Sequence, residues 1–263
     1  MKLDLHCHTK EGSLDGQIPL KKYALHLKKM GFDGMLITDH NSYRAYRYFC
    51  SHRSEPEFDN FTVLKGIEYD TCDAGHILVI MPEHVRLPIL ELRGLPVRLL
   101  VDIVHSFHGI LGPAHPFGQK YLSLANCSYY KRHPEILECF DFVETFNACE
   151  SPASNRKAAA LAKKYALPEI GGSDAHKIKC AGLAYTDMEA EIATESDFIQ
   201  AILNNTPTSG AGTYYHGTTR EHLGPAYNLL LWCYWLYNKC CNFRCSFRRR
   251  MEVKAWKKGL RRL

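Results

Sequence analysis

The apolar residues of this chain fall into short, nearly continuous runs, separated by segments that have helical or turn-like spacing. Runs of this kind are typical of strands that are buried on both faces, as in a parallel sheet. We expect strands at residues 2–6, 34–40, 61–69, 76–82, 109–116, 140–147 and 168–176, with a last strand at 182–189.

Helices are predicted between some of these runs. Apolar residues recur every three or four positions between residues 20 and 30, and Gly31 then supplies a helix stop. Ser151, followed by proline, is a favourable start for a second helix that continues through residues 154–166. Residues 83–108 have the least definite pattern, because two prolines interrupt their apolar stretches.

This alternation of strands and helices indicates an α/β fold built on a parallel sheet, either doubly wound or closed as a barrel. With 263 residues, the chain has the length of one large domain with a small appendage. We expect the barrel to occupy residues 1–210, including a small C-terminal extension, and residues 211–263 to form an aromatic and basic tail that is helical.

The composition is that of a globular protein, with 46% hydrophobic and 23% charged residues. The first predicted strand begins directly after Met1, so we expect no signal peptide, and no apolar run reaches the roughly 20 residues of a membrane span. The 11 cysteines have no disulfide-framework spacing. We therefore expect reduced thiols and a cytoplasmic location.

The net charge of +5 conceals a strong asymmetry. Residues 239–263 contain ten Lys or Arg residues and one Glu, so they carry +9 and the remainder carries −4. We favour a tail helix that packs on the barrel with its basic end in water, and weak contact with an anionic membrane is the alternative. No nucleic-acid-binding motif accompanies the basic residues, so no specific nucleic acid binding is expected.

The first predicted strand ends in the sequence LDLHCHT, residues 3–9. Residues i and i+2 of a strand point to the same side, so His6 and His8 project together and Cys7 points away. Further imidazole, carboxylate and amide groups follow the other strands, at the end where α/β folds place their sites. They are Asp39, His40, Glu68, His76, His115, Glu144, Asn147, Asp174 and His176.

The motifs LDLHCHT, SLDG, ITDHN, GIEY, GHILV, GPAHP, ETFN and GGSDAH together resemble those of the PHP family, the polymerase and histidinol phosphatase superfamily. The resemblance extends over residues 1–210 with the motifs in the same order. It implies a distorted parallel (β/α)7 barrel whose mouth holds a cluster of metal ions, most often three.

The resemblance also implies nine metal ligands in three groups. For the three ions in turn, they are His6, His8, Glu68 and Asp174; Glu68 again with His76 and His115; and Asp15, His40 and His176. Glu68 would thus bridge two ions, and we expect Glu68, Asp174 and His176 to act in catalysis. All nine positions hold the expected residue type.

This mixture of imidazole and carboxylate ligands suits two or three Mn²⁺, Fe²⁺ or Zn²⁺ ions, whereas Mg²⁺ prefers oxygen ligands. A water between two such ions is a hydroxide near neutral pH, and the ions also neutralise a phosphoryl group. We therefore expect hydrolysis of a small phosphorylated metabolite, such as histidinol phosphate, a nucleotide or a cyclic phosphodiester. Asn147 and Arg156 are our candidates for binding this substrate.

Two other functions remain open. An amidohydrolase barrel also begins with His-x-His, but that class of C–N hydrolase usually has a metal-bridging lysine where this chain has Glu68. The second alternative is a non-enzymatic metal-binding scaffold that is recruited through its basic tail. Turnover of phosphate esters and its loss on chelation would separate these functions.

Overall fold

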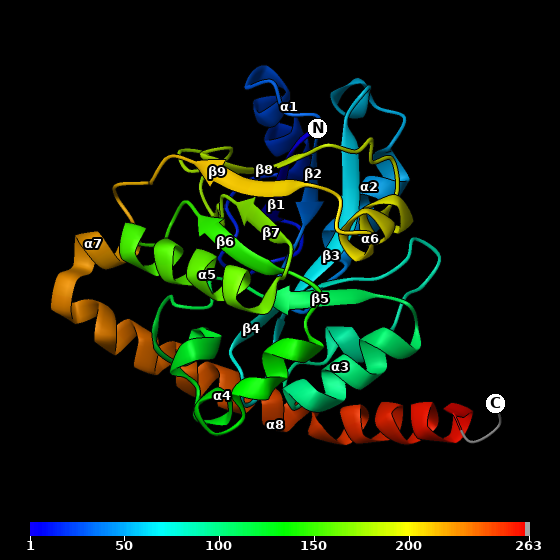
Figure 1. Cartoon of the computed structure of the whole chain (residues 1–263), viewed down its shortest axis with the longest axis vertical. Helices are drawn as coiled ribbons and strands as arrows, with labels where there is room; N and C mark the ends of the chain where they lie inside the picture. Colours follow the sequence, from blue (N-terminus) through cyan, green and yellow to red (C-terminus); the bar gives the residue numbers. More distant parts are fainter. Residues whose placement is uncertain (261–263) are drawn as a thin grey trace.

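The computed structural model describes residues 1–260, which form a curled sheet, a smaller pair of strands and helices around them (Figure 1). The large sheet has the strand order β5-β4-β3-β2-β1-β8-β9, and β6 and β7 form the pair. The strands are β1 (Lys2–Cys7), β2 (Gly34–Ile37), β3 (Thr62–Asp70), β4 (His76–Ile80), β5 (Ile110–Pro113), β6 (Val143–Asn147), β7 (Glu169–Gly172), β8 (Ala184–Met188) and β9 (Thr208–Gly212).

The helices lie on the outside of this curled sheet (Figure 1). They are α1 (Leu20–Lys29), α2 (Arg44–His52), α3 (Val97–Ser106), α4 (Ser128–Arg132), α5 (Pro152–Tyr165), α6 (Glu195–Leu203), α7 (Thr219–Leu223) and α8 (Tyr227–Leu260). The Ser151 side chain accepts a hydrogen bond from the backbone N–H of Ser154 and so caps α5, as the sequence predicts. Helix α3 lies in the segment whose pattern was least definite.

The expected α/β fold class is confirmed, because the sheet curls into a distorted half-barrel with helices around it (Figure 1). Strands β1, β2 and β3 are parallel to one another, as are β6 and β7. Strand β4 instead runs antiparallel to both β3 and β5, and β8 runs antiparallel to β1 and β9. The link of residues 71–75 explains the first reversal, because a parallel crossover needs about a dozen residues.

Strand β1 lies inside the sheet, between β2 and β8, and its side chains after Lys2 are buried. Leu3 and Leu5 pack in an apolar cluster with residues from the neighbouring strands and α6. The intervening Asp4 is also buried, and its carboxylate accepts hydrogen bonds from the backbone N–H and the hydroxyl of Ser173, at 2.8 and 2.6 Å. These two hydrogen bonds hold the end of β7 beside β1. The residues that follow the two strands therefore lie together at the mouth of the half-barrel.

Helix α8 is 34 residues long and extends along one side of the molecule, at the bottom of Figure 1. Its backbone accepts a hydrogen bond at Leu231 from the Tyr121 hydroxyl, at 2.9 Å, and Trp256 donates one to the Ser106 hydroxyl, at 3.0 Å. Among residues 1–260, no helix combines the length and apolar character needed to cross a membrane. The division of the chain at residue 210 stays a prediction, although β9 continues the sheet to Gly212.

Candidate metal centre

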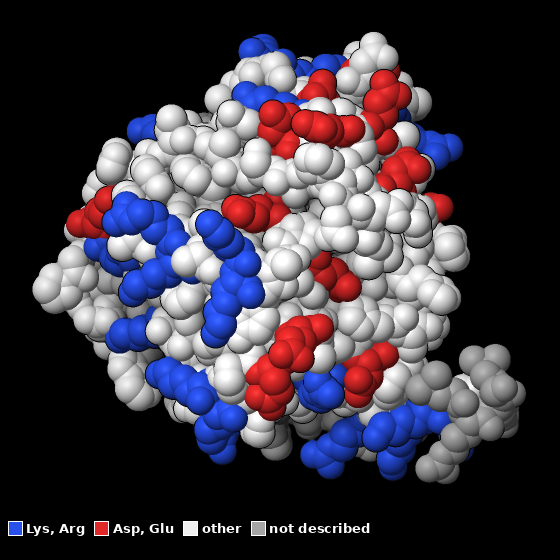
Figure 2. Space-filling model, in the orientation of Figure 1, with Lys and Arg blue, Asp and Glu red and all other residues white. Residues whose placement is uncertain are grey.

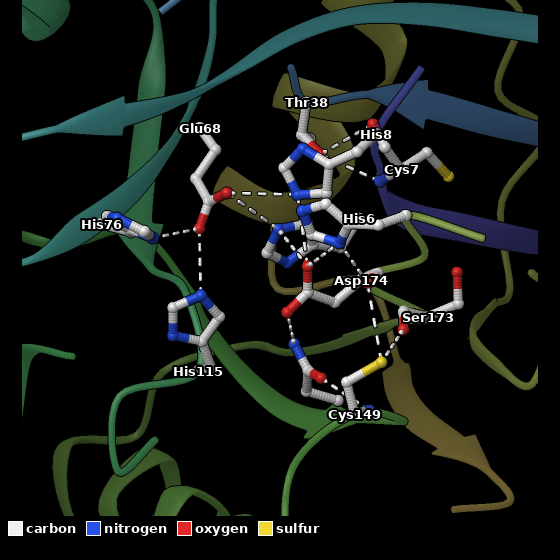
Figure 3. Close-up of polar contacts among 12 residues, drawn as sticks. His6, Cys7, His8, Thr38, Glu68, His76, His115, Cys149, Ser173 and Asp174 are labelled. Carbon is white, nitrogen blue, oxygen red and sulfur yellow. Dashed lines mark hydrogen bonds and ion pairs between the residues drawn. The ribbon is translucent and has the colours of Figure 1, made fainter. Parts of the chain in front are cut away.

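The two histidines of the first strand point into the mouth of the half-barrel. His6 and His8 are fully buried, with ring centroids 5.1 Å apart, while Cys7 directs its sulfur away from them (Figure 3). The alternation of side chains along β1 therefore gives the arrangement expected from the sequence.

Glu68, near the end of β3, occupies the centre of the cluster (Figure 3). Its Oε1 lies 2.8 Å from Nδ1 of His76 and 3.0 Å from Nε2 of His115. Its Oε2 lies 3.4 Å from Nε2 of His6 and 3.2 Å from Nε2 of His8. Nδ1 of His40 also lies 3.4 Å from Oε2. One carboxylate thus faces a different group of histidines with each oxygen, which is the geometry that a bridging ligand requires.

Asp174 follows β7 and faces His6 and His8. Its Oδ1 lies 3.5 Å from Nε2 of His6 and 3.2 Å from Nε2 of His8. The Asp174 backbone has φ +51°, a left-handed conformation, and its N–H donates to the carbonyl of His6 at 2.8 Å. The turn after β7 therefore directs this carboxylate back over the end of β1.

The third group of predicted ligands, Asp15, His40 and His176, lies beside His8, nearer the surface. Oδ2 of Asp15 lies 3.2 Å from Nε2 of His176 and 3.8 Å from Nε2 of His40. Ring nitrogens of His8, His40 and His176 also lie within 4.8 Å of one another. The structure thus brings all nine predicted ligand positions into one cluster, and their roles as ligands stay a prediction.

Four buried ring nitrogens of the cluster make no hydrogen bond of good geometry within residues 1–260, although each lies 2.8–3.6 Å from a carboxylate oxygen. They are Nε2 of His6, Nε2 of His8 and both ring nitrogens of His76. A buried polar atom without a hydrogen bond lowers the stability of the folded protein, so such atoms usually have a bound water or ion as a partner. Imidazole nitrogens beside carboxylates form a donor set that fits divalent ions.

The charges of the cluster shift its pKa values. Burial raises the pKa of Glu68, but the imidazoles of His76 and His40 outweigh burial and hold it well below its usual range. For His40, burial lowers the pKa, but Glu68 and Asp70 outweigh that and raise it to about 9. The pKa of His115 is also about 9, because its hydrogen bond to Glu68 outweighs burial. Without metal, His40 and His115 therefore hold protons near neutral pH, and these protons balance the charge of nearby carboxylates.

Two carboxylates that were not among the predicted site residues contact its histidines and orient them. Oε1 of Glu144 lies 2.8 Å from Nδ1 of His6, and its Oε2 accepts from the backbone N–H of His115 at 2.5 Å. Oδ1 of Asp70 lies 3.1 Å from Nδ1 of His40. The contact of Glu144 could have been expected from its position near a strand end. That of Asp70 could have been expected from its spacing, two residues after Glu68 on the same strand.

The two predicted substrate-binding residues have different surroundings. The amide of Asn147 donates to Oδ2 of Asp174 at 3.1 Å and to Oε2 of Glu144 at 3.2 Å, so Asn147 orients site carboxylates. Arg156 is exposed on α5 and does not line the pocket, because α5 turns Asn155 and Ala158 inward and directs Arg156 to solvent.

A cavity of about 750 Å³ opens over the cluster. Its floor includes Glu68 and Asp174, and its opposite wall comes from the start of α8 with Tyr227, Tyr234 and Tyr237. The packing of a tail helix on the barrel was expected from the sequence, but no residue of this wall was among the predicted substrate-binding residues. The tail contributes to the pocket because the inward face of α8 crosses the mouth of the half-barrel.

Basic side chains also line this cavity. They are Arg93, Lys177 and Arg220. Nη1 of Arg93 lies 3.3 Å from Oδ2 of Asp70, and its guanidinium lies 5.4 Å from the ring centre of Tyr237. Sequence reasoning missed Arg93 because it lies in the segment with the least definite pattern.

Comparisons with known proteins agree with this geometry. The family model of the PHP domain matches residues 4–143, and a model described as PHP-associated matches residues 152–207. No curated protein sequence matches the chain.

Solved structures share the fold at low identity. PsfC from Pseudomonas syringae is 19% identical with a TM-score of 0.60, over 87% of this chain and 96% of its own. A candidate metal-dependent phosphoesterase from Bifidobacterium adolescentis is 15% identical with a TM-score of 0.55, over 78% and 96%. Endonuclease Q in complex with a 27-mer duplex is 18% identical with a TM-score of 0.61, over 84% and 66%. At these identities the likeness establishes the fold.

Proposed function

The chain belongs to the PHP domain family, and on this premise we propose that it is a metal-dependent phosphoesterase that hydrolyses a small phosphate ester. The observation that carries the proposal is the placement of Glu68 between two groups of histidines, several of whose buried ring nitrogens make no hydrogen bond within the described residues. The name of the Bifidobacterium adolescentis neighbour supports the same class of reaction.

The nine clustered residues would hold two or three divalent ions, of which Mn²⁺, Fe²⁺ and Zn²⁺ suit the imidazole-rich donor set. When bound, such ions supply activation of a water near neutral pH and neutralisation of phosphoryl charge. Glu68 would bridge two ion positions, while Asp174 and His176 complete the first and third groups. Asp174 is held by the amide of Asn147 at 3.1 Å, which keeps its carboxylate oriented toward the reacting centre.

The residues of the pocket also suggest how the ester is held. Arg93, Lys177 and Arg220 line the cavity and can neutralise phosphate oxygens that lie outside the cluster. Tyr227 and Tyr234 offer an apolar surface on the opposite side. A small ester with a planar or apolar group, of which a nucleoside monophosphate is an example, matches both surfaces.

The amidohydrolase alternative finds less support in the geometry. Glu68 occupies the central position at which that class usually has a lysine. Lys65, three residues earlier on the same strand, directs its ammonium group to the carbonyls of Pro82, Glu83 and Val85, at 2.7–2.9 Å. Its pKa is lowered by burial, and the three carbonyls hold it away from the cluster.

The test is a substrate panel with the full chain, stripped of metal and then reconstituted separately with Mn²⁺, Fe²⁺ or Zn²⁺. Phosphate release from nucleoside monophosphates, histidinol phosphate and glycerol phosphate is compared with hydrolysis of cyclic phosphodiesters, dipeptides and cyclic amides. We expect turnover of at least one phosphate ester and none of the amides. Amide turnover without ester turnover would assign the chain to C–N hydrolysis, and no turnover of any compound would favour a metal-binding scaffold.

We also propose a cytoplasmic location. All eleven cysteines lie within the described residues and are free thiols. Reduced thiols in this number are typical of a reducing compartment. Fractionation of cells followed by detection of the protein would test this location.

A further inference from the structure

The outward face of α8 carries a stripe of exposed apolar side chains, which we call the outer stripe. Its members are Leu229, Trp232, Leu236, Phe243, Phe247 and Met251. They follow one another at intervals of three, four or seven residues, so they lie along one side of the helix. Phe243 is 82% exposed, Phe247 76% and Trp232 63%. A continuous apolar surface of this length is unusual on a protein without a partner.

Basic residues border the outer stripe on both edges. At 100° per residue, Lys239, Arg250 and Lys257 fall on one edge, and Arg244 and Arg248 fall on the other. All five are exposed. Figure 2 shows Lys and Arg side chains along the C-terminal half of α8, at the lower right. The surface thus combines an apolar centre with positive margins.

The opposite face of α8 is fixed to the half-barrel. Arg249 donates a hydrogen bond to the carbonyl of Arg93, and Arg93 donates one to Asn238. Val253 and Trp256 pack against the apolar cluster that includes α3. The helix therefore lies flat along the protein, and the outer stripe and its basic edges face away from the half-barrel, where they can contact another surface.

We propose that the outer stripe and its basic edges dock this protein on an anionic lipid surface. Exposed aromatic and aliphatic side chains enter the boundary between headgroups and acyl chains, where Trp is favoured. Lys and Arg at the margins then meet acidic headgroups, and each contributes to binding in a salt-sensitive way. A helix that is already held flat by the protein has the orientation that this contact needs.

Other occupants fit the surface less well. A second copy of the chain would bring the basic edges of two α8 helices together, because a two-fold interface joins identical surfaces. Those like charges would repel each other. A nucleic acid would pair with the basic edges but would leave the apolar stripe in water.

The experiment is sedimentation of the full-length protein with vesicles of phosphatidylcholine alone and with vesicles that also contain phosphatidylserine. We expect several-fold more protein on the anionic vesicles, with binding that falls as salt is raised. The double variant Phe243→Asp/Phe247→Asp should lower vesicle affinity at least about tenfold. Its matched control is Leu203→Asp, which changes a 52% exposed leucine on α6 and should bind as the parent does.

A second pair of variants tests the charges without altering any apolar side chain. Arg244→Glu/Arg248→Glu should lower affinity for anionic vesicles about tenfold or more. Lys163→Glu/Lys164→Glu makes the same charge change at the end of α5 and should have little effect. Circular dichroism confirms that each variant retains its helices.

Four results would overturn the proposal. The first is absence of binding to either vesicle, and the second is equal, salt-insensitive binding to both. The third is a loss of binding in the control variants as large as in the α8 variants. The last is a dimer, detected by light scattering, that depends on Phe243 and Phe247 while vesicles leave the protein in solution.

Discussion

Nδ1 of His6 lies 2.8 Å from Oε1 of Glu144, and both side chains are fully buried. With this contact on one side of the ring, Nε2 of His6 faces Glu68 and Asp174 on the other. A carboxylate behind a metal-binding histidine fixes the tautomer and the orientation of the ring. We therefore expect Glu144 to act through His6 as a positioning residue.

Replacing Glu144 by glutamine tests this role. Glu144→Gln keeps the size of the side chain but weakens the contact with His6, so we expect a 10- to 100-fold loss of metal affinity or turnover. Metal content by elemental analysis and initial rates measure the effect. Glu135→Gln is the matched control, because Glu135 faces His133 at 3.1 Å on the surface. Equal losses in both variants would contradict the role.

The tyrosines of α8 predict a selective effect on substrate binding. Tyr234→Ala removes an aromatic side chain from the cavity wall, so KM for a nucleoside monophosphate should rise roughly tenfold while KM for glycerol phosphate changes little. Steady-state rates with both esters provide the comparison. Tyr48→Ala on α2, which alters a half-buried tyrosine outside the cavity, should leave both values unchanged. A uniform rise for both esters would argue against an apolar subsite.

Two truncations separate the parts of α8. A chain that ends at Asn238 retains Tyr227, Tyr234 and Tyr237, so we expect it to keep KM within a few-fold of the full chain. A chain that ends at Ala226 lacks this wall and should have a much higher KM. The thermal unfolding midpoint serves as the control for folding, since the shorter chains also lose the packing of Trp256. Similar kinetics for both truncations would show that the wall does not contact substrate.

Metal uptake should depend on pH. The pKa values of His40 and His115 are about 9 without metal, above the usual 6.5, so a divalent ion must displace their protons. Metal affinity should therefore increase from pH 7 to 9, with proton release on binding. Titration calorimetry in buffers of different ionisation enthalpy measures that release, and affinity that does not change with pH would oppose this account.

The same pKa values predict the stability of the metal-free protein. Because the folded pKa of His40 and His115 is raised, their contribution to stability is complete below pH 6.5 and is lost as the pH rises through about 9. The thermal midpoint of metal-free protein should fall over this range. The metal-loaded protein, in which the imidazoles carry no exchangeable charge, is the control and should show a smaller fall.

The sequence was sufficient to predict most of the strands and the positions of the nine clustered residues. Strand ends such as His6 and Glu68 could be located because buried strands have a distinct apolar pattern and their ends carry polar residues. The antiparallel direction of β4 was not evident, since it depends on the short link of residues 71–75 rather than on the strand itself. Strand β9, Thr208–Gly212, contains two glycines and lacks a strand-like apolar pattern.

The contacts between distant segments were beyond the sequence pattern. Glu144 and His6 are 138 residues apart, so their pairing depends on how the strands are arranged. Helix α8 is apolar on both its barrel-facing and its outward sides, which removes the periodicity that would have shown its orientation. Its role as a pocket wall therefore required the three-dimensional structure.

The central claim, that Glu68 joins metal ions in a hydrolytic site, is tested most directly by one titration. Metal-free protein receives increasing Mn²⁺ or Zn²⁺, and bound metal and phosphate release from a nucleoside monophosphate are measured on the same samples. We predict that turnover rises with bound metal until two or three ions are present per chain, disappears on chelation, and stays at least about 100-fold lower in folded Glu68→Gln. Full turnover with less than one ion per chain, or in Glu68→Gln, would contradict the account.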